Sequence, residues 1–199
     1  MHLNNHAESL RQRLKALTEP FHTELEKMSI AIALADGSIT RENYAIYLTK
    51  LASIHQMVES RMVAMSDWSR HGIDPTIRLR LRLLQADLDA LNHPYIIEEI
   101  PSNDIEWSFA TAVGMMYVLE GSTMGGQILS RRLTYITDTK GVPCTRYFQA
   151  YGENTMRLWG EFCQFLDRFQ AENPHLSNQV ILGACTMFLM IQNDTHELN

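Results

Sequence analysis

The sequence predicts an all-α protein, a bundle of about seven helices. Apolar residues recur at three- and four-residue steps along most of the chain, which is the pattern of amphipathic helices. Residues that start helices stand ahead of several of these segments. The stretch 77–83 alternates like a strand, but it would have no second strand to pair with, so we interpret it as helix. Helices packed on helices are the architecture that remains.

The first half of the chain predicts two long helices. The first covers about residues 8–28 and carries a single apolar stripe. Pro20 lies within it and is expected to bend or restart the helix just before His22, because proline removes a backbone N–H. Thr40 is typical of an N-cap and predicts a second helix that runs to about Trp68.

The second half begins with another start signal, Asp74 followed by Pro75, and that helix is expected to end at His93-Pro94. The residues Pro101, Ser102, Asn103 and Asp104 predict a further cap. Later helices are expected at about 104–135, 145–150, 153–171 and 177–190. No repeat or Gly/Ser-rich linker divides the chain, so we expect a single domain over 1–199, with its core at about 8–190 and short termini outside it.

Composition and charge exclude several classes of protein. Hydrophobic residues make up 45% of the chain, which argues against disorder or a fibrous repeat. The net charge of -6 makes nucleic acid a poor default partner. No uninterrupted apolar run approaches the ~20 residues of a membrane span, and the N-terminus lacks a signal-peptide core. Three widely spaced cysteines without CxxC spacing fit a reducing compartment, so we expect a cytoplasmic protein.

Four glycines within thirteen residues mark the segment 114–126. Each interior glycine costs a helix about 1 kcal/mol relative to alanine. At about 100° per residue, Gly114, Gly121 and Gly125 fall on one narrow strip, while Gly126 turns away. Such a strip lets something flat approach the backbone, and it equally lets another helix pack closely without any ligand. The pattern alone leaves both interpretations open.

The pair His22 and Glu26 is a candidate metal-binding unit. At four-residue spacing both side chains lie on one helix face, so the carboxylate can accept the Nδ1 proton and leave Nε2 for a metal. Surface pairs of this kind are common, and the spacing alone is weak evidence. His55 is an alternative ligand or a hydrogen-bonded core residue. The other histidines lie in tails or loops: His2, His6, His71, His93, His175 and His196.

A non-heme di-iron site is a competing interpretation, because Glu19-x-x-His22 has the spacing that such bundles use. A second copy on a partner helix is missing. Pro20 also interrupts the single copy, so the pattern disfavours a di-iron centre without excluding it.

Three segments together resemble the heme oxygenase family. The segment 18–26 is similar to the family's proximal helix, and 117–127 is similar to its distal helix, especially the Tyr-Val-Leu-Glu-Gly-Ser core of the bacterial branch. The segment 148–152, followed by Trp159 and Phe162, is similar to a later helix region. The likeness spans about residues 8–190. It implies an all-α fold in which heme is sandwiched between the proximal and distal helices.

The resemblance implies roles for particular residues. His22 corresponds to the proximal iron ligand and Glu26 to its orienting partner. Gly121 and Gly125 correspond to the distal residues that let the backbone approach heme closely.

More residues follow from the same resemblance. Lys15 matches a basic position near the heme propionates, and Tyr117 and Tyr151 are expected at the pocket or on the propionate side. Ser122 stands where some members have an aspartate that orders distal water, as it does in the bacterial branch. The distal group is therefore Gly121, Ser122 and Gly125, and Glu19 replaces a lysine of some members, which weakens the propionate clamp.

The implied activity is oxidative cleavage of heme to biliverdin with release of iron and carbon monoxide. Heme would be both substrate and cofactor, O2 the oxidant, and a ferredoxin or a flavin reductase the electron donor. A biliverdin-using photoreceptor is an additional conceivable partner, and no membrane or nucleic acid is expected. The alternative is a non-catalytic heme or tetrapyrrole-binding protein on the same fold, motivated by Ser122.

Overall fold

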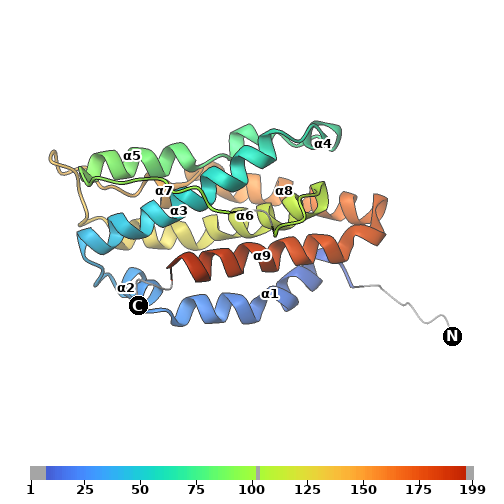
Figure 1. Cartoon of the computed structure of the whole chain (residues 1–199), viewed down its shortest axis with the longest axis horizontal. Coiled ribbons are helices and arrows are strands. Elements are labelled where there is room, and N and C mark those ends of the chain that lie inside the picture. Colours follow the sequence, from blue (N-terminus) through green and yellow to red (C-terminus); the bar gives the residue numbers. More distant parts are fainter. Residues whose placement is uncertain (1–7, 102–103, 196–199) are drawn as a thin grey trace.

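The structure, a computed structural model, describes residues 8–101 and 104–195, and in this part helices joined by loops are present and no strand (Figure 1). Its one sheet-like feature there is an isolated bridge between Thr137 and Pro143. The all-α prediction is confirmed. The α-helices are α1 (Leu10–Lys27), α2 (Ser29–Asp36), α3 (Arg41–Val63), α4 (Asp67–Arg70), α5 (Leu81–Leu91), α6 (Phe109–Arg132), α7 (Arg146–Gln149), α8 (Thr155–Glu172) and α9 (Ser177–Thr195).

Helix α6 runs through the middle of the bundle, between α3 and α9 (Figure 1). Its backbone touches that of α9 directly. A Cβ at Gly114 would overlap the carbonyl oxygen of Val180, and a Cβ at Gly183 would overlap that of Thr111. Gly114 therefore serves helix packing, which is one of the two interpretations that the glycine strip allowed.

Side-chain caps set the start of the long helices. Ser9 forms a capping box with Gln12 at the start of α1. Thr40 accepts a hydrogen bond from the Asn43 amide at the start of α3, as predicted. Helix α6 begins later than expected because Ser108 is its cap.

The predicted start of that helix at Asp104 is therefore wrong. Ser102 and Asn103, which belonged to the expected cap, lie outside the described residues, as do His2, His6 and His196. The C-terminal bound near 135 is also too long, since α6 ends at Arg132.

Several other helix bounds differ from the prediction. Helix α1 continues across Pro20 without a restart. The predicted second helix ends at Val63, and α4 is separate. Asp74 and Pro75 start only a single 3-10 turn, Thr76–Arg78, before α5.

Helix α2 was not predicted. Its residues are apolar or small on every side, so they show no amphipathic period, and no side chain caps it. It ends at Gly37, whose φ of 79° is in the left-handed region. Among the described residues nine α-helices are present, where about seven were expected.

Two apolar clusters form the core. One joins α1, α6, α8 and α9 with the C-terminal half of α3. The other joins α2, α5 and α7 with the N-terminal half of α3. Both clusters contribute side chains to the cavity described below, which therefore lies where they meet.

Within the described residues one segment, Pro174–Thr195, is long and apolar enough to cross a membrane by length and composition. The sequence analysis looked for an uninterrupted apolar run. This segment has few charges, but polar residues interrupt it, so it did not stand out. Here it is the helix that packs most extensively against α6, so it also belongs to the core.

Candidate functional site

A cavity of about 590 Å³ lies between α1 and α6, within the size range of small-molecule sites. Apolar side chains from both core clusters make up most of its wall, Ile54 from one and Leu51 from the other. Of the predicted site residues, those that line it are Lys15, His22, Glu26, Tyr117, Gly121, Ser122 and Gly125.

His22 presents its imidazole to this cavity from α1. The side chain is 55% exposed, and its ring packs edge-on against Phe188 of α9, with ring centroids 6.2 Å apart. The distance from Nδ1 to the Glu26 carboxylate is 3.6 Å, too long for the predicted hydrogen bond. Because both side chains are exposed, only a weak electrostatic attraction relates them. The imidazole is thus available to a ligand.

Gly121 and Gly125 lie on the part of α6 that lines the same cavity. A Cβ at Gly125 would meet no atom within 4 Å, and one at Gly121 would meet only the rim of Trp159 at 3.9 Å. These two glycines therefore leave open space that any side chain would reduce. Gly126 is different, because its Cβ would lie 2.9 Å from the carbonyl oxygen of Phe148.

Ser122 is held from behind by Arg80, a buried cation that sequence analysis did not single out. The Arg80 guanidinium donates to the Leu119 carbonyl oxygen at 2.5 Å and to Ser122 Oγ at 3.2 Å. The Ser122 hydroxyl donates in turn to the Leu119 carbonyl, at 2.7 Å. Since its proton is committed, Ser122 offers the cavity an acceptor and not a donor.

A second buried chain of polar groups lies beside Arg80. His55 Nδ1 lies 2.6 Å from a Glu59 carboxylate oxygen, and Nε2 lies 3.1 Å from the Tyr147 hydroxyl. Because a carboxylate accepts only, Nδ1 carries the proton and Nε2 accepts from Tyr147. Burial lowers the pKa of His55, which favours this neutral form. His55 is therefore a hydrogen-bonded core residue and not a ligand, one of the two roles considered for it.

Glu59 and Arg80 connect the two chains. The same Glu59 carboxylate accepts from the backbone amides of Arg80 and Leu81. The Arg80 guanidinium lies over the Tyr147 ring, 5.0 Å from its centroid. Burial raises the pKa of Tyr147, so its phenol stays protonated.

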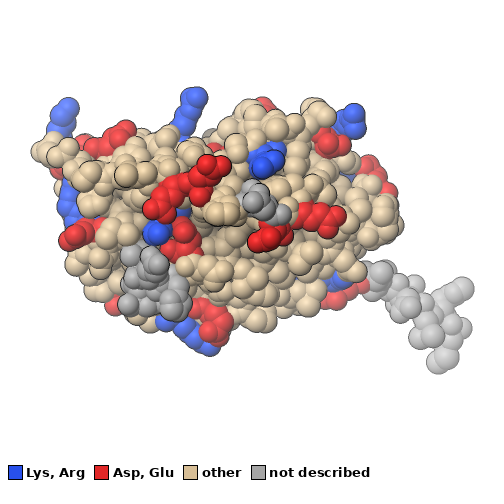
Figure 2. Space-filling view, viewed as in Figure 1, with Lys and Arg blue, Asp and Glu red and all other residues tan. Residues whose placement is uncertain are grey.

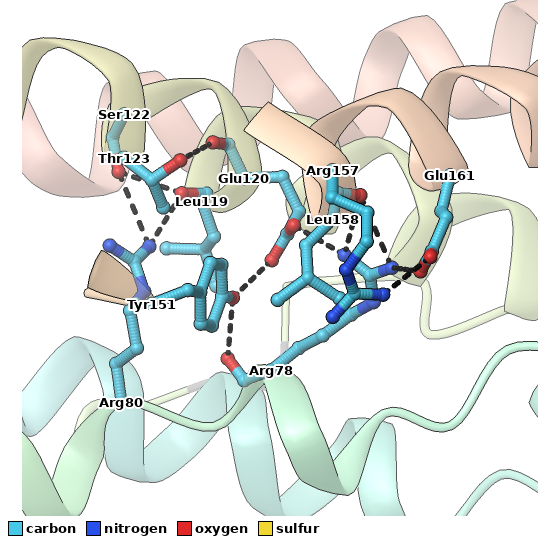
Figure 3. A network of polar contacts seen from close by, with 10 residues as sticks. All are labelled: Arg78, Arg80, Leu119, Glu120, Ser122, Thr123, Tyr151, Arg157, Leu158 and Glu161. Carbon is cyan, nitrogen blue, oxygen red and sulfur yellow. Dashed lines mark hydrogen bonds and ion pairs between the residues drawn. The ribbon is translucent and has the colours of Figure 1, made fainter. Parts of the chain in front are cut away.

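Tyr151 is not among the residues that line the cavity. Its hydroxyl donates to Glu120 Oε1 at 2.5 Å (Figure 3), and Glu120 is not a lining residue of the cavity either. Arg78 forms a buried ion pair with the other Glu120 oxygen and donates to the Leu158 carbonyl at 3.3 Å. The structure thus separates Tyr151 from the other predicted site residues.

The opening of the cavity carries mixed charge. Lys15 is its one exposed cation among the lining residues, and Glu19 and Glu26 stand near it on α1. Acidic side chains also gather across the middle of the face shown in Figure 2, with Lys and Arg more scattered, in keeping with the net charge of -6. That face carries no basic patch of the kind that nucleic acid requires.

Sequence reasoning missed Arg78 and Arg80 because of their place in the alternating stretch 77–83. Helical periodicity would not bury both of them. The structure instead runs through a 3-10 turn and an extended Leu79, which turns both arginines inward and leaves Ile77 53% exposed. The alternation of apolar and charged residues was the signal in the sequence that could have pointed to them. In a half-buried strand the apolar positions would face inward, but here the arginines face inward and Ile77 faces outward.

No group of three or more His, Cys, Asp or Glu side chains that could hold a metal ion occurs within residues 8–101 and 104–195. Within these residues Glu19 and His22 thus belong to no larger group of such side chains, and the structure gives the di-iron interpretation no support there.

Comparison with known proteins adds two findings at the level of sequence. The family model described as heme oxygenase matches residues 8–193. A curated protein of Xanthomonas campestris pv. campestris (strain 8004), named heme oxygenase, is 31% identical over 162 residues, which cover 78% of this chain and 90% of the relative.

Solved structures show the same fold. The NO- and CO-bound heme oxygenase of Neisseria meningitidis matches with a TM-score of 0.79 at 19% identity, covering 96% of this chain and 92% of that one. The heme oxygenase of Leptospira interrogans gives 0.75 at 17% identity, with coverage of 96% and 100%. Heme oxygenase-1 of the cyanobacterium Synechocystis sp. PCC6803, solved in complex with heme, gives 0.71 at 18% identity, with coverage of 96% and 93%.

Proposed function

Because this chain belongs to the heme oxygenase family and is a heme-degrading enzyme, we propose that it cleaves heme to biliverdin with release of iron and carbon monoxide. The observation that carries the proposal is one shared cavity. An unbonded imidazole, His22, reaches it from α1, and two glycines with open space beside them line it on α6.

The cavity fits a flat apolar group with one metal. Its wall is mostly apolar, and its volume of about 590 Å³ suits a ligand of this class. Gly121 and Gly125 keep their side of the cavity clear of side chains. Bound heme supplies the redox-active iron that reduces O2 and the macrocycle that is cleaved.

The side chains on α1 are proposed to bind the iron and a propionate. His22 Nε2 is the proposed iron ligand, and Glu26, 3.6 Å from Nδ1, is its proposed orienting partner. Lys15 is the proposed partner of a propionate at the opening of the cavity, with Tyr117 beside it on α6. A neutral histidine ligand suits ring oxidation, because it does not force early O–O cleavage as a thiolate would.

The distal groups are proposed to order water. Ser122 Oγ and the Tyr147 oxygen have their protons committed to Leu119 and His55, so each offers an acceptor lone pair at the cavity wall. A water that donates to these acceptors is held in place without an acidic side chain. This arrangement would take over the task that an aspartate performs in other family members.

The co-reactants follow from the proposed chemistry. O2 is the oxidant, and a small ferredoxin or a flavin reductase is the proposed electron donor, because the heme iron must be reduced repeatedly. We also propose a cytoplasmic enzyme, in keeping with its three free cysteines. A photoreceptor that takes up biliverdin is an additional proposed partner.

The test is a single-turnover reaction. Purified protein is mixed with one equivalent of hemin, and its spectrum is recorded before and after anaerobic reduction. Oxygen and a ferredoxin with its reductase are then added. We expect the heme absorption to disappear, a biliverdin band to form, and carbon monoxide to be trapped by reduced myoglobin.

Two outcomes would contradict the proposal. Tight binding of heme that survives the reaction intact would indicate a tetrapyrrole carrier. Purified protein that contains iron but binds no added hemin would indicate a non-heme iron protein. Free hemin with the same donor system, without the protein, controls for coupled oxidation in solution.

A further inference from the structure

We propose that Tyr151 is a positioning residue: it fixes residues 119–126 of α6, here called the glycine segment, against the cavity, although its own side chain lies outside the cavity. The proposal rests on the proposed function for its meaning in catalysis. Its structural basis is the stretch 148–152, which comprises the last two residues of α7 and the turn after it and contacts α6 between Glu120 and Gln127. We call this stretch the α7 turn.

The first contact of the α7 turn joins Tyr151 to a buried ion pair (Figure 3). Glu120 directly precedes Gly121, and its side chain is 2% exposed. One carboxylate oxygen binds Arg78, and the other accepts the Tyr151 hydroxyl at 2.5 Å. A hydrogen bond to a buried charge is among the stronger ones in proteins, so this contact resists movement of the Glu120 backbone.

Two further contacts lie farther along the glycine segment. The Phe148 carbonyl oxygen lies so close to Gly126 that a Cβ there would stand 2.9 Å away. The Gln127 amide donates to the Gly152 carbonyl oxygen at 2.8 Å and to Thr155 Oγ1 at 2.8 Å. The α7 turn therefore touches α6 at residues 120, 126 and 127, which bracket Gly121 and Gly125.

The backbone of the α7 turn is bent in an uncommon way to make these contacts. Ala150 has a φ of 45° and Gly152 a φ of 56°, so positive angles flank Tyr151 on both sides. A positive φ is unfavourable at alanine and persists only where surrounding interactions hold it. The bend aims Tyr151 at Glu120, and it is the Tyr151 hydroxyl that anchors the bend.

The glycine segment depends on contacts from other elements because its two cavity-lining glycines make no side-chain contacts. Gly121 and Gly125 have no side chains to pack, and the cavity leaves open space beside them. Arg80 holds Leu119 and Ser122 from one direction, and Tyr151 holds Glu120 from another. The backbone that must approach the substrate is thus held by Arg80 at the wall of the cavity and by Tyr151 from outside it.

The test compares Tyr151→Phe with the wild-type protein by amide hydrogen exchange in the absence of heme. The variant keeps the ring and loses the hydroxyl. We expect amides of residues 119–126 to exchange about tenfold faster, the loss expected for one hydrogen bond to a charged group. Exchange in α1, α3 and α5 should stay as in the wild type. In the heme-loaded enzyme we expect kcat to fall and KM for hemin to stay within about twofold.

Tyr44→Phe is the matched control, because Tyr44 is fully buried, away from the cavity, and donates to the Cys144 carbonyl at 2.7 Å. Its exchange should rise near Cys144 and not in residues 119–126. Unchanged exchange of residues 119–126 in Tyr151→Phe would overturn the proposal, and so would an equal rise throughout the protein. If that variant fails to fold, the wild-type protein alone gives a second test: the amides of residues 119–126 and of the α7 turn should open together, and clearly different opening free energies would overturn the proposal.

These measurements separate this proposal from the proposed function. Exchange is measured without heme, so a failure to form biliverdin leaves its outcome unaffected. Conversely, unchanged exchange would overturn the role of Tyr151 and leave heme cleavage standing.

Discussion

The two walls of the cavity are built in different ways. On α1, His22 is 55% exposed and Glu26 is 68% exposed, and no hydrogen bond joins them. On α6, by contrast, Leu119, Glu120 and Ser122 are each tied to a side chain from another element. The α1 wall carries a reactive side chain that few contacts hold in place. The α6 wall exposes mainly backbone, and several hydrogen bonds hold that backbone in place.

This difference indicates how the two walls are completed. The imidazole of His22 gains its missing partner when a metal binds, so its orientation can be set by the substrate. Gly121 and Gly125 make no directional contact of their own, so their position has to be set by the protein in advance. Variants on the two walls should accordingly fail in different ways.

The largest effect is expected for His22→Ala. Loss of the proposed iron ligand should reduce heme cleavage by more than about 100-fold, the upper range for removing even a supporting partner of a metal ligand. Because the side chain is exposed, the free energy of unfolding should change by less than about 0.5 kcal/mol. The measurements are the ferric heme spectrum, turnover and urea unfolding. His175→Ala, an exposed histidine near α9, is the control, and a spectrum unchanged in His22→Ala would move the ligand elsewhere.

The glycines of α6 should divide into two classes. Gly125→Ala meets open space, so it should stabilise the helix by about 1 kcal/mol and yet lower kcat about tenfold or more by filling the cavity. Gly114→Ala would overlap the Val180 carbonyl, so it should destabilise the protein by about 3 kcal/mol or more. Thermal unfolding with turnover distinguishes the two. Loss of stability in both variants would show that the whole strip serves packing.

The buried His55 should give the protein a pH-dependent stability. Burial lowers the folded-state pKa of His55 below its ordinary value of 6.5, so the unfolded chain takes up the proton first. Stability from this group is complete above pH 6.5 and falls as the pH drops below it, by at most about 1.4 kcal/mol per pH unit. The slope ends at the folded pKa. Urea unfolding between pH 5 and 8 measures it, and His55→Gln should flatten it; an identical slope in the variant would assign the dependence to other groups.

The smallest effect is expected for Lys15→Gln. An exposed ion pair with a propionate contributes little in water, so the affinity for hemin should fall by less than about fivefold. The remaining affinity should also depend less on salt, because the charge contact is gone. Hemin titrations at low and high salt measure both. Lys140→Gln, an exposed lysine in another part of the chain, should leave both unchanged, and a loss as large as that of His22→Ala would mean that Lys15 does more than hold charge.

The fold could be predicted from the sequence wherever helices are amphipathic and capped. The caps and stripes of α1 and α3 carry local information, and Thr40 caps as expected. Helix α2 was missed because Ser29–Asp36 has no polar face, so its helicity depends on tertiary packing. The start of α6 was misplaced because Asp104 and Ser108 are both plausible caps, and only the second is used.

The candidate site was predictable in one respect and not in another. Residues whose role follows from a local motif, such as His22 and Gly121, do line the cavity. Arg80 binds the Leu119 carbonyl across 39 positions of sequence, and Tyr151 binds Glu120 across 31. No local pattern in the sequence reveals such contacts. Tyr151 was expected at the pocket because the segment 148–152 resembles a later helix region of the family. Phe148 of this segment does line the cavity, but Ala150 has a positive φ and the Tyr151 side chain lies outside it.

The position of the cavity between the two apolar clusters affects how readily the protein is degraded in the cell. A substrate that fills the cavity contacts side chains of both clusters. Because it binds only the folded chain, a ligand at 100 times its Kd adds about 2.7 kcal/mol to the free energy of unfolding. Proteases act on opened chains, and the empty protein opens more often. We therefore expect the amount of this enzyme to rise with the supply of heme and to decline when heme is consumed, without any change in its synthesis.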